Sequence, residues 1–311
     1  MLNKLDSLAN AKEPFLFFTD FKASHFHVYT LDELQQNDIE FSFDEHFTHH
    51  AHNLNLTKSP LSFENYKTKF DAVIENIKAG NTYLLNLTAK NPVTCKHSFK
   101  KIFKHANAPF KLRFKDKFVC FSPEPFITIT DNTISTFPMK GTIDASLENA
   151  EKIILNDEKE MAEHVMIVDL LRNDLGIIAN DVRVEKFRYT EVISAGEKKL
   201  LHVSSKISAT LPDGWQKNLS TLIKTVLPAG SISGTPKRKT VELIDEIEGY
   251  ERGYFTGVFG IFDGRNLKSA VMIRFLEKEN GQLFYKSGGG ITLQSDAQSE
   301  YKELIDKIYI P

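Results

Sequence analysis

Two pairs of glutamates form the clearest chemical pattern in the sequence. Glu160 and Glu163 lie three residues apart in DEKEMAEHVMIVDLLRNDLG, and Glu300 and Glu303 repeat that spacing in SDAQSEYKELIDKI. Because residues three apart on a helix share a face, each pair can direct two carboxylates the same way. Four such carboxylates can bind a Mg²⁺ ion bridged to a substrate carboxylate. The spacing favours equally a structural role, with Glu160 in a helix cap and Glu303 paired with Lys307 on the surface.

Two glycine-containing segments could bind an anion. In KSGGGITLQS, a glycine-rich turn lets backbone N–H groups approach a negative group without obstruction by a Cβ atom, at Gly288, Gly289 and Gly290. In LPAGSISGTPKRK, Ser231 precedes a helix that is expected to open at Pro236, a favoured first-turn position for proline. An ordinary junction between a loop and a helix has the same pattern as the second segment, so both interpretations stay open there.

Three further side chains have both a chemical and a structural interpretation. Arg274 interrupts the apolar run VMIRF, where an inward arginine would grip a carboxylate through two hydrogen bonds and an outward one would mark a sheet edge. His202, in LLHVSSKI, suits a catalyst or a buried structural histidine. Lys140, in PMKGT, is by position alone a solvent-exposed lysine at the end of a strand.

Apolar periodicity indicates the elements that must position these residues. Residues 14–43 contain the runs PFLFF, FHVYTL and IEFSF, which are typical of edge strands. Further strands are expected in TYLLNLT, FKLRF, KFVCFSP, FITIT, TISTFPMKGT, GYFTGVFGIF, SAVMIRF and LFYKSG. Helices are expected over residues 63–79, 157–175, 215–225, 237–249 and 296–308. This order predicts an α+β fold with large, mainly antiparallel sheets covered by helices.

Caps and buried faces can be predicted for the two glutamate-bearing helices. The first is expected to begin at Asp157, to end at Gly176 and to bury the stripe Met161, Val165, Val168 and Leu175. The second is expected to begin with a capping box of Ser295 and Gln298 and to bury Tyr301, Leu304, Ile305 and Ile308.

The composition excludes several classes of function. The 311 residues are 41% hydrophobic and 26% charged, and the formal net charge of −2 provides no global positive field for nucleic acid or an anionic membrane. Cys95 and Cys120 are too few for a disulfide framework, and no segment has the apolar length of a signal peptide core or a membrane span. With no repeat or linker, we expect one cytoplasmic domain over 1–311, with a short N-terminal sheet region over about 1–62.

A histidine cluster follows the N-terminal strands. Four histidines so close together could ligate a metal, but no strand or helix pattern fixes their geometry. A solvent-exposed loop is therefore the favoured interpretation for His46, His49, His50 and His52.

Taken in order, several motifs resemble those of the chorismate-utilising enzymes, over roughly residues 65–310. They are FSPEPF, PMKGT, KEMAEHVMIVDLLRNDLG, LLHVSS, PAGSISGTPK, ERGYFTGVFG, IR and GGGITLQSDAQSEYKE. Within the family, the sequence is most similar to the large subunits of aminodeoxychorismate synthases and to their relatives, anthranilate synthase components I. The resemblance implies two stacked, largely antiparallel sheets flanked by helices, in agreement with the apolar patterns.

The resemblance also implies a role for each candidate residue. The ligands of a Mg²⁺ that holds the ring carboxylate of chorismate would be Glu160, Glu163, Glu300 and Glu303. Chorismate itself would be bound by Gly141, Thr142, Ser231, Phe255, Arg274, Gly288, Gly289, Gly290 and Lys307. Among these, Arg274 would hold the enolpyruvyl carboxylate, and Ser231 would lie with His202 beside the ring and its C4 hydroxyl. The catalytic residues would be Lys140 and His202.

Three positions bear on which activity the resemblance implies. Leu84 stands where isochorismate and salicylate synthases have a lysine that activates water, which argues against those activities. Phe255 replaces the usual tyrosine or tryptophan, and neighbouring Tyr254 is the alternative hydrogen-bond donor. PMKGT matches the PIKGT of aminodeoxychorismate synthases, whereas anthranilate synthases have alanine in place of Lys140.

The lysine implies a covalent route. Lys140 would attack C2 of the ring as the C4 hydroxyl leaves, and ammonia would then attack C4. To do so, its pKa must fall from ~10.4 toward ~7–8 through burial or nearby cations, such as Mg²⁺ and Lys307. The implied product is 4-amino-4-deoxychorismate, a precursor of p-aminobenzoate and folate. The alternatives are anthranilate synthase component I and, in another class, a non-catalytic chorismate-binding protein, against which the glutamate pairs argue.

A partner is expected to supply the ammonia. Neither Cys95 nor Cys120 lies in a glycine-flanked turn that would suit the nucleophile of a glutaminase. We therefore expect a separate glutamine amidotransferase subunit, with free ammonia able to replace it.

Overall fold

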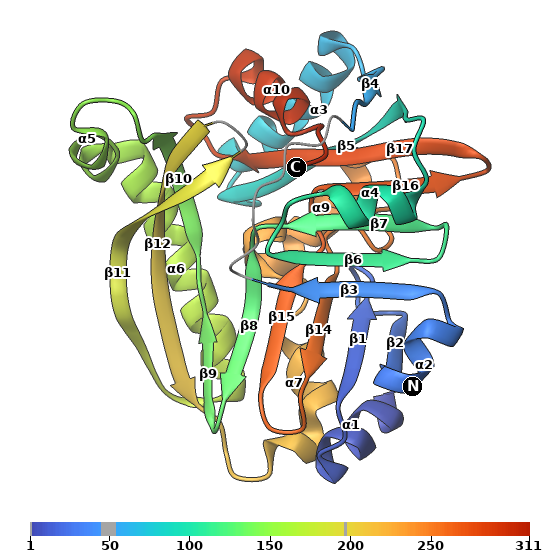
Figure 1. Cartoon of the computed structure of the whole chain (residues 1–311). Helices are drawn as coiled ribbons and strands as arrows, with labels where there is room; N and C mark the ends of the chain where they lie inside the picture. The colour runs from blue at the N-terminus through green and yellow to red at the C-terminus, as the bar shows by residue number, and fades with distance from the viewer. Residues whose placement is uncertain (1, 45–53, 196–197) are drawn as a thin grey trace.

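The computed structural model describes residues 2–44, 54–195 and 198–311, which form two large sheets surrounded by helices (Figure 1). Every strand pair described in it is antiparallel. The predicted α+β class, with two stacked, largely antiparallel sheets, is therefore confirmed. The predicted loop with four clustered histidines lies outside the described residues; these histidines are His46, His49, His50 and His52.

The nine strands of the first sheet run from β10 at one side to β2 at the other. In spatial order they are β10 (Met139–Asp144), β12 (Lys198–Thr210), β9 (Thr133–Thr136), β8 (Pro125–Thr130), β15 (Leu267–Val271), β14 (Val258–Phe262), β1 (Phe15–Thr19) and β2 (Phe26–Thr30), with β11 (Asn180–Ala195) paired to β12. The eight strands of the second sheet are β13 (Gly234–Thr235), β5 (Leu84–Thr94), β17 (Gln282–Ile291), β16 (Phe275–Glu279), β7 (Phe118–Ser122), β6 (Phe110–Phe114) and β3 (Ile39–Phe43), with β4 (Thr57–Lys58) paired to β5.

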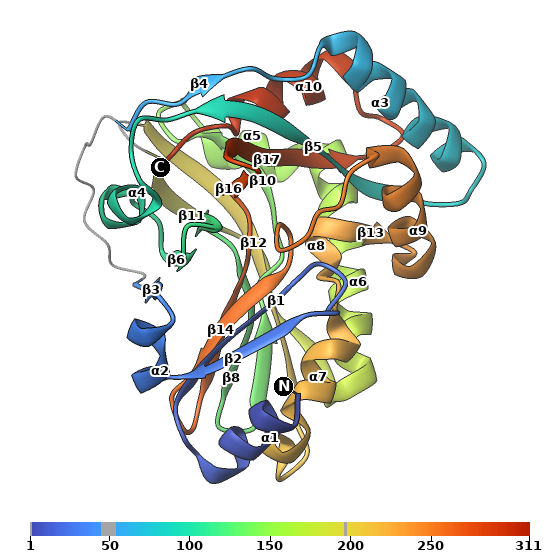
Figure 2. The ribbon, with the colours of Figure 1, turned by 90° about the vertical axis from the view of Figure 1, so that its right-hand side faces the viewer.

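Helices cover the outer faces of both sheets. Helix α6 packs on β10, β11 and β12, whereas α3 and α10 pack on β5 and β17 (Figure 2). The helices are α1 (Leu2–Ala11), α2 (Leu31–Gln36), α3 (Phe63–Lys78), α4 (Phe99–His105), α5 (Ala150–Asn156), α6 (Glu158–Ile178), α7 (Leu219–Val226), α8 (Gly230–Ser233), α9 (Lys237–Glu248) and α10 (Ala297–Asp306), with a 3₁₀ turn over Trp215–Asn218. None of the described helices combines the length and apolar character needed to span a bilayer.

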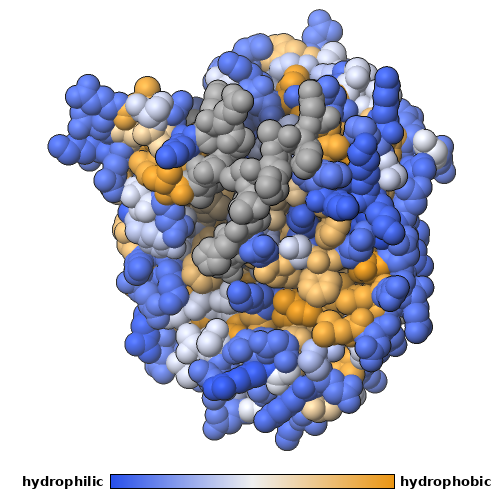
Figure 3. All heavy atoms as spheres, in the orientation of Figure 1, coloured by the Kyte–Doolittle hydropathy of each residue, from blue (hydrophilic) through white to orange (hydrophobic). Residues whose placement is uncertain are grey.

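The apolar core has two main parts. The larger part lies between the helices and both sheets, and includes Leu85 of β5. The other joins the two sheets through aromatic residues such as Phe18 of β1 and Phe118 of β7. Their rings are 6.0 Å apart in an edge-to-face arrangement, a geometry that aromatic pairs favour. Figure 3 shows that hydrophobic residues, drawn in orange, also reach the surface on the lower right of the face seen in Figure 1. The aromatic residues of the N-terminal strands therefore hold the two sheets against each other.

The N-terminal region belongs to both sheets. β1 and β2 join the first sheet, and β3 joins the second. The prediction that all three are edge strands is wrong for β1, which lies between β14 and β2 with all five of its residues buried. A continuous apolar run of this kind is typical of a strand buried on both faces.

The apolar run SAVMIRF is not one strand, as predicted, but two. β15 ends at Val271 in the first sheet and β16 begins at Phe275 in the second, so the intervening residues cross between the sheets. At this crossing Arg274 has a positive φ of 51°, a left-handed conformation that interrupts a strand. Periodicity could not reveal the break because both strands are buried. The segment GYFTGVFGIF is likewise a strand only from Val258 onward.

The predicted buried stripe of α6 is confirmed only in its second half. Val168 and Leu175 are 5% and 1% exposed, but Met161 and Val165 are 36% and 46% exposed. Near the start of the helix, the inward face carries Glu163 and His164, which have hydrogen-bonding partners there. A hydrophobic pattern selects the wrong face for that first part of the helix.

The helix ends agree only in part with the predictions. Asp157 caps α6 as expected, but the helix continues beyond Gly176. Helix α10 is capped by Asp296 rather than Ser295, whose hydroxyl donates instead to the carboxylate of Glu300 over 2.8 Å. This serine therefore orients one of the predicted metal ligands.

A buried ion pair joins elements near the predicted site. The side chains of Arg252 and Glu248 are 2% and 0% exposed, and they lie 2.7 Å apart. Arg252 also donates to the backbone oxygens of Ile232 in α8 and Asn86 in β5. Glu248 accepts a hydrogen bond from the backbone N–H of Thr88. The pair therefore ties α8 and the end of α9 to β5.

We expect Glu248→Ala to lower the free energy of unfolding by about 3–5 kcal/mol, because it leaves Arg252 buried without its carboxylate. Asp245→Ala is the control. Asp245 lies on the same helix and pairs with Lys22, but the side chains of Asp245 and Lys22 are 48% and 41% exposed. That change should cost less than ~1 kcal/mol. Urea unfolding measures both, and equal losses would contradict the expectation.

Candidate active site

The structure brings the two glutamate pairs together at one end of β17. From α6, Glu163 accepts a hydrogen bond from the hydroxyl of Thr292 over 3.4 Å, just beyond the strand. From α10, the carboxylates of Glu300 and Glu303 lie 3.4 and 3.5 Å from the position that a Cβ of Gly289 would take. The glutamates of two helices far apart in the sequence therefore border one surface.

The three glycines lie within β17, not in the glycine-rich turn predicted from the sequence. They pair with residues of β5, and a Cβ at Gly288 would lie 2.3 Å from the backbone oxygen of Leu87. Gly289 faces the carboxylates of α10, while the Cβ position of Gly290 lies 3.7 Å from Nζ of Lys140. Because these residues lack side chains, the strand leaves room for charged groups from both sides.

Lys140 reaches the same surface from β10. Its Nζ lies 2.6 Å from the carboxylate of Glu163. Burial lowers the pKa of Lys140, but the carboxylates of Glu163, Glu160 and Glu303 outweigh burial and raise it above its usual value. The expectation that burial and cations lower this pKa is therefore wrong for this structure, because its dominant charged neighbours are carboxylates.

Lys307 adds a second ammonium group beside the glycines. Its Nζ lies 2.5 Å from Glu303 and donates to the backbone oxygen of Gly288 over 2.9 Å. Burial lowers the pKa of Lys307, and the nearby cations of Arg274 and Lys140 act in the same direction, against the carboxylate of Glu303. Lys307 thus lies beside the glycines and Glu303, and its contact with a substrate carboxylate stays a prediction.

The residues present fit a hard divalent cation by charge and by donor type. Four carboxylates border this surface, and two of them pair with ammonium groups, Glu163 with Lys140 and Glu303 with Lys307. Carboxylate oxygens are the ligands that Mg²⁺ prefers. Within the described ranges, however, no three His, Cys, Asp or Glu side chains are already grouped as metal ligands. Mg²⁺ would therefore have to compete with the two lysines for Glu163 and Glu303.

Glu124, in FSPEPF, is a site residue that sequence reasoning missed. Its carboxylate accepts a hydrogen bond from the hydroxyl of Ser231. Burial raises the pKa of Glu124, although the hydrogen bond from Ser231 and the cations Lys307 and Arg274 oppose this effect. The available signal in the sequence was an acidic residue two positions after the buried strand FVCFS.

Arg274 and His202 face the same region. The guanidinium of Arg274 lies 5.2 Å from the centre of the Tyr309 ring. Burial and the nearby Arg274 lower the pKa of His202 to about 4, so its ring is neutral at neutral pH. Its Nδ1 contacts the sulfur of Met139 at 2.8 Å, and its buried Nε2 has no hydrogen-bond partner among the described residues. A buried nitrogen of this kind is suited to bind a ligand.

The remaining predicted residues differ in placement. Gly141, with a φ of 101°, and exposed Thr142 follow Lys140 on β10. Phe255 is 3% exposed within the aromatic core, and the hydroxyl of Tyr254 bonds His27 over 2.7 Å. Contact of either ring with a substrate stays a prediction.

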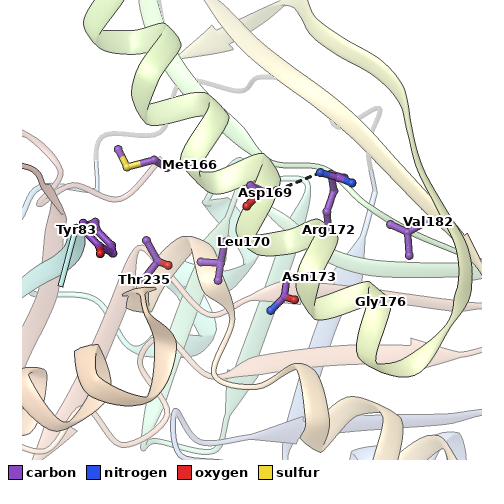
Figure 4. Close-up of a pocket in the computed structure, with 9 residues that line it drawn as sticks. All are labelled: Tyr83, Met166, Asp169, Leu170, Arg172, Asn173, Gly176, Val182 and Thr235. Atoms are coloured by element: carbon purple, nitrogen blue, oxygen red, sulfur yellow. Dashed lines mark hydrogen bonds and ion pairs between the residues drawn. The ribbon is translucent and has the colours of Figure 1, made fainter. Parts of the chain in front are cut away.

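A separate pocket of about 650 Å³ lies along α6 and is also lined by Thr235 of β13 and Val182 of β11 (Figure 4). Its lining includes Tyr83, Arg172 and Asn173 but none of the predicted site residues. Arg172 is held there by an ion pair with Asp169 over 3.1 Å. The charged groups that could bind a metal and an anionic substrate therefore lie outside this pocket, around the glycines of β17.

The chain has relatives among known sequences. The chain is 45% identical over 304 residues to an "Uncharacterized PabA-like protein" of Haemophilus influenzae, covering 96% of this chain and 93% of that relative. It is 34% identical over 309 residues to aminodeoxychorismate synthase component 1 of Escherichia coli, covering 90% of this chain and 65% of the relative.

Solved structures show the same fold. Anthranilate synthase component I from Streptococcus pneumoniae matches with a TM-score of 0.70 and 25% identity, covering 82% of this chain and 58% of that one. The menaquinone-specific isochorismate synthase of Escherichia coli matches with a TM-score of 0.75 and 15% identity, covering 98% and 79%. The model of the chorismate binding enzymes matches residues 10–310. The chain therefore belongs to the chorismate binding enzyme family.

Proposed function

We propose that the protein is an aminodeoxychorismate synthase component I, which converts chorismate and ammonia to 4-amino-4-deoxychorismate. The observation that carries the proposal is the position of Lys140, whose amine lies between Glu163 and the backbone of Gly290. The similarity to the aminodeoxychorismate synthase component 1 of Escherichia coli supports it. An anthranilate synthase would have no use for a nucleophilic lysine at this place.

The proposed binding mode follows from the charges. Mg²⁺, when bound by the glutamate pairs, would neutralise them and hold the ring carboxylate of chorismate. Lys307 and the backbone at Gly288 and Gly289 lie beside that carboxylate position, and Arg274 would bind the carboxylate of the enolpyruvyl group. The neutral ring of His202 would contact the substrate through its Nε2.

The proposed reaction has two displacements. The Nζ of unprotonated Lys140 forms a bond to C2 as both ring double bonds shift and the bond from C4 to its hydroxyl breaks. The hydroxyl takes a proton from Glu124 and leaves as water. Ammonia then bonds to C4, both double bonds shift back, and the bond between C2 and Lys140 breaks, which frees the amine. The new ammonium group at C4 returns a proton to Glu124. Neutralisation of the surrounding carboxylates would be needed for the first step, because they now favour the ammonium form of Lys140.

Product identification tests the proposal directly. Purified protein is incubated with chorismate, Mg²⁺ and an ammonium salt, and the products are identified by mass spectrometry. Aminodeoxychorismate is expected, whereas anthranilate as the sole product would make the chain an anthranilate synthase. We also propose that a separate glutamine amidotransferase provides ammonia in the cell. Rapid glutamine hydrolysis by this chain alone would contradict that part.

Glu124→Gln should lower kcat by about 10²–10⁴-fold, because the amide cannot donate a proton to the leaving hydroxyl. A raised pKa keeps more of Glu124 protonated, so the wild-type rate should fall as pH rises through that pKa. In Glu124→Gln this descending limb should be absent. Ser208→Ala, which removes a hydroxyl bonded to Glu185 outside the site, is the control. A wild-type rate in Glu124→Gln would exclude the acid role.

A further inference from the structure

The backbone around Lys140 is irregular in a way that affects where its side chain points. In β10, Lys140 and Gly141 oppose a single residue of β12, Val203, which defines a β-bulge. A bulge removes a residue from the regular ladder and redirects its side chain. The left-handed φ of 101° at Gly141 completes the irregular segment.

A histidine on α6 binds this segment. Nδ1 of His164 lies 3.3 Å from the backbone oxygen of Lys140, and Nε2 lies 2.6 Å from Oγ of Ser205 on β12. Both side chains are 0% exposed. His164 thus supplies the backbone oxygen of Lys140 with a hydrogen-bond partner at the bulge, where the regular ladder is interrupted.

The direction of these hydrogen bonds follows from a third contact. The backbone N–H of Arg188 donates to Oγ of Ser205 over 2.9 Å. The hydroxyl proton of Ser205 is then available to donate to Nε2 of His164, which places the ring proton on Nδ1, toward the Lys140 oxygen. The opposite tautomer would place an unprotonated Nδ1 against that oxygen. The chain of hydrogen bonds therefore fixes both the ring and the carbonyl group that it holds.

We infer that His164 and Ser205 form a positioning pair that holds the β-bulge of β10 and thereby aims the amine of Lys140 at the substrate. The expected effect on catalysis rests on the proposed function, in which Lys140 is the nucleophile. The expected effect on the backbone of β10 is independent of the proposed function. Neither residue is required to touch chorismate or to exchange a proton with it.

Hydrogen exchange tests the structural part without reference to any reaction. We expect His164→Leu and Ser205→Ala to increase amide exchange in a peptide spanning residues 137–144 by at least about tenfold, because local opening becomes easier. Ser208→Ala is the matched control, since it removes a buried serine hydroxyl from the same strand without a bond toward Lys140. Unchanged exchange in both test variants would overturn the inference.

Kinetics with two isosteric amides separates positioning from general stability. Asparagine can place an N–H near the position of Nδ1 and bond the Lys140 oxygen, whereas glutamine reaches toward Nε2 and Ser205. We expect His164→Asn to keep kcat within about threefold of wild type and His164→Gln to lose about 10–100-fold, with KM for chorismate unchanged in both. If kcat fell equally in both variants, in proportion to a lowered melting temperature, the positioning role would be overturned. Altered exchange in His164→Leu with unchanged kcat in His164→Gln would instead contradict the nucleophilic role of Lys140.

Discussion

Lys140→Ala should reduce aminodeoxychorismate formation by about 10³-fold or more, because it removes the amine that forms the covalent adduct. Binding of chorismate and Mg²⁺ should persist, since the four glutamates remain. Ammonia entering the vacated space could then attack C2 and yield some C2-aminated product. Chromatography with mass spectrometry measures both products in one assay.

Lys206→Ala is a matched control for that experiment. Lys206 of β12 and Glu185 of β11 lie 2.6 Å apart outside the site, the same distance as that between Lys140 of β10 and Glu163 of α6. The control variant should retain the wild-type rate. Aminodeoxychorismate formation at the normal rate in Lys140→Ala would show that the covalent assignment is wrong.

Glu163→Gln and Glu300→Gln should each lower the rate by about 10²–10³-fold, because each removes one charged oxygen ligand from the proposed Mg²⁺ site. Two carboxylates brought together are unfavourable unless a cation neutralises them. The wild-type enzyme should accordingly lose activity in excess EDTA and recover it when Mg²⁺ is restored.

Direct measurement of Mg²⁺ binding tests the role of the glutamates without relying on the activity assay. Calorimetric titration with Mg²⁺ in the presence of chorismate should show weaker binding in both variants and unchanged binding in Glu185→Gln, which alters a carboxylate on β11 away from the site. Full turnover in EDTA, or tight Mg²⁺ binding by Glu163→Gln, would show that the glutamates do not hold the metal.

The sequence was most informative where a local pattern determines geometry. The spacing of Glu300 and Glu303 fixes their common helix face, and regular apolar runs fix most strands. Prediction from the sequence failed where tertiary contacts determine which side chains are buried. The inward face at the start of α6 could not be found from hydrophobicity, because Glu163 and His164 are buried with partners on other elements. The charge environment of Lys140 likewise depends on helices that the sequence places far away.

The glycines of β17 restrict how a protein with this site can change its chemistry. A side chain at Gly288 would collide with the main chain of β5, which cannot yield without breaking the sheet. Lys140, by contrast, extends from a bulge at one side of that surface, where a different residue disturbs no strand pairing. Efforts to redirect the enzyme to another nucleophile should therefore vary position 140 and leave the glycines untouched. For the same reason, evolution of new activities on this fold should change position 140 more readily than the glycines of β17.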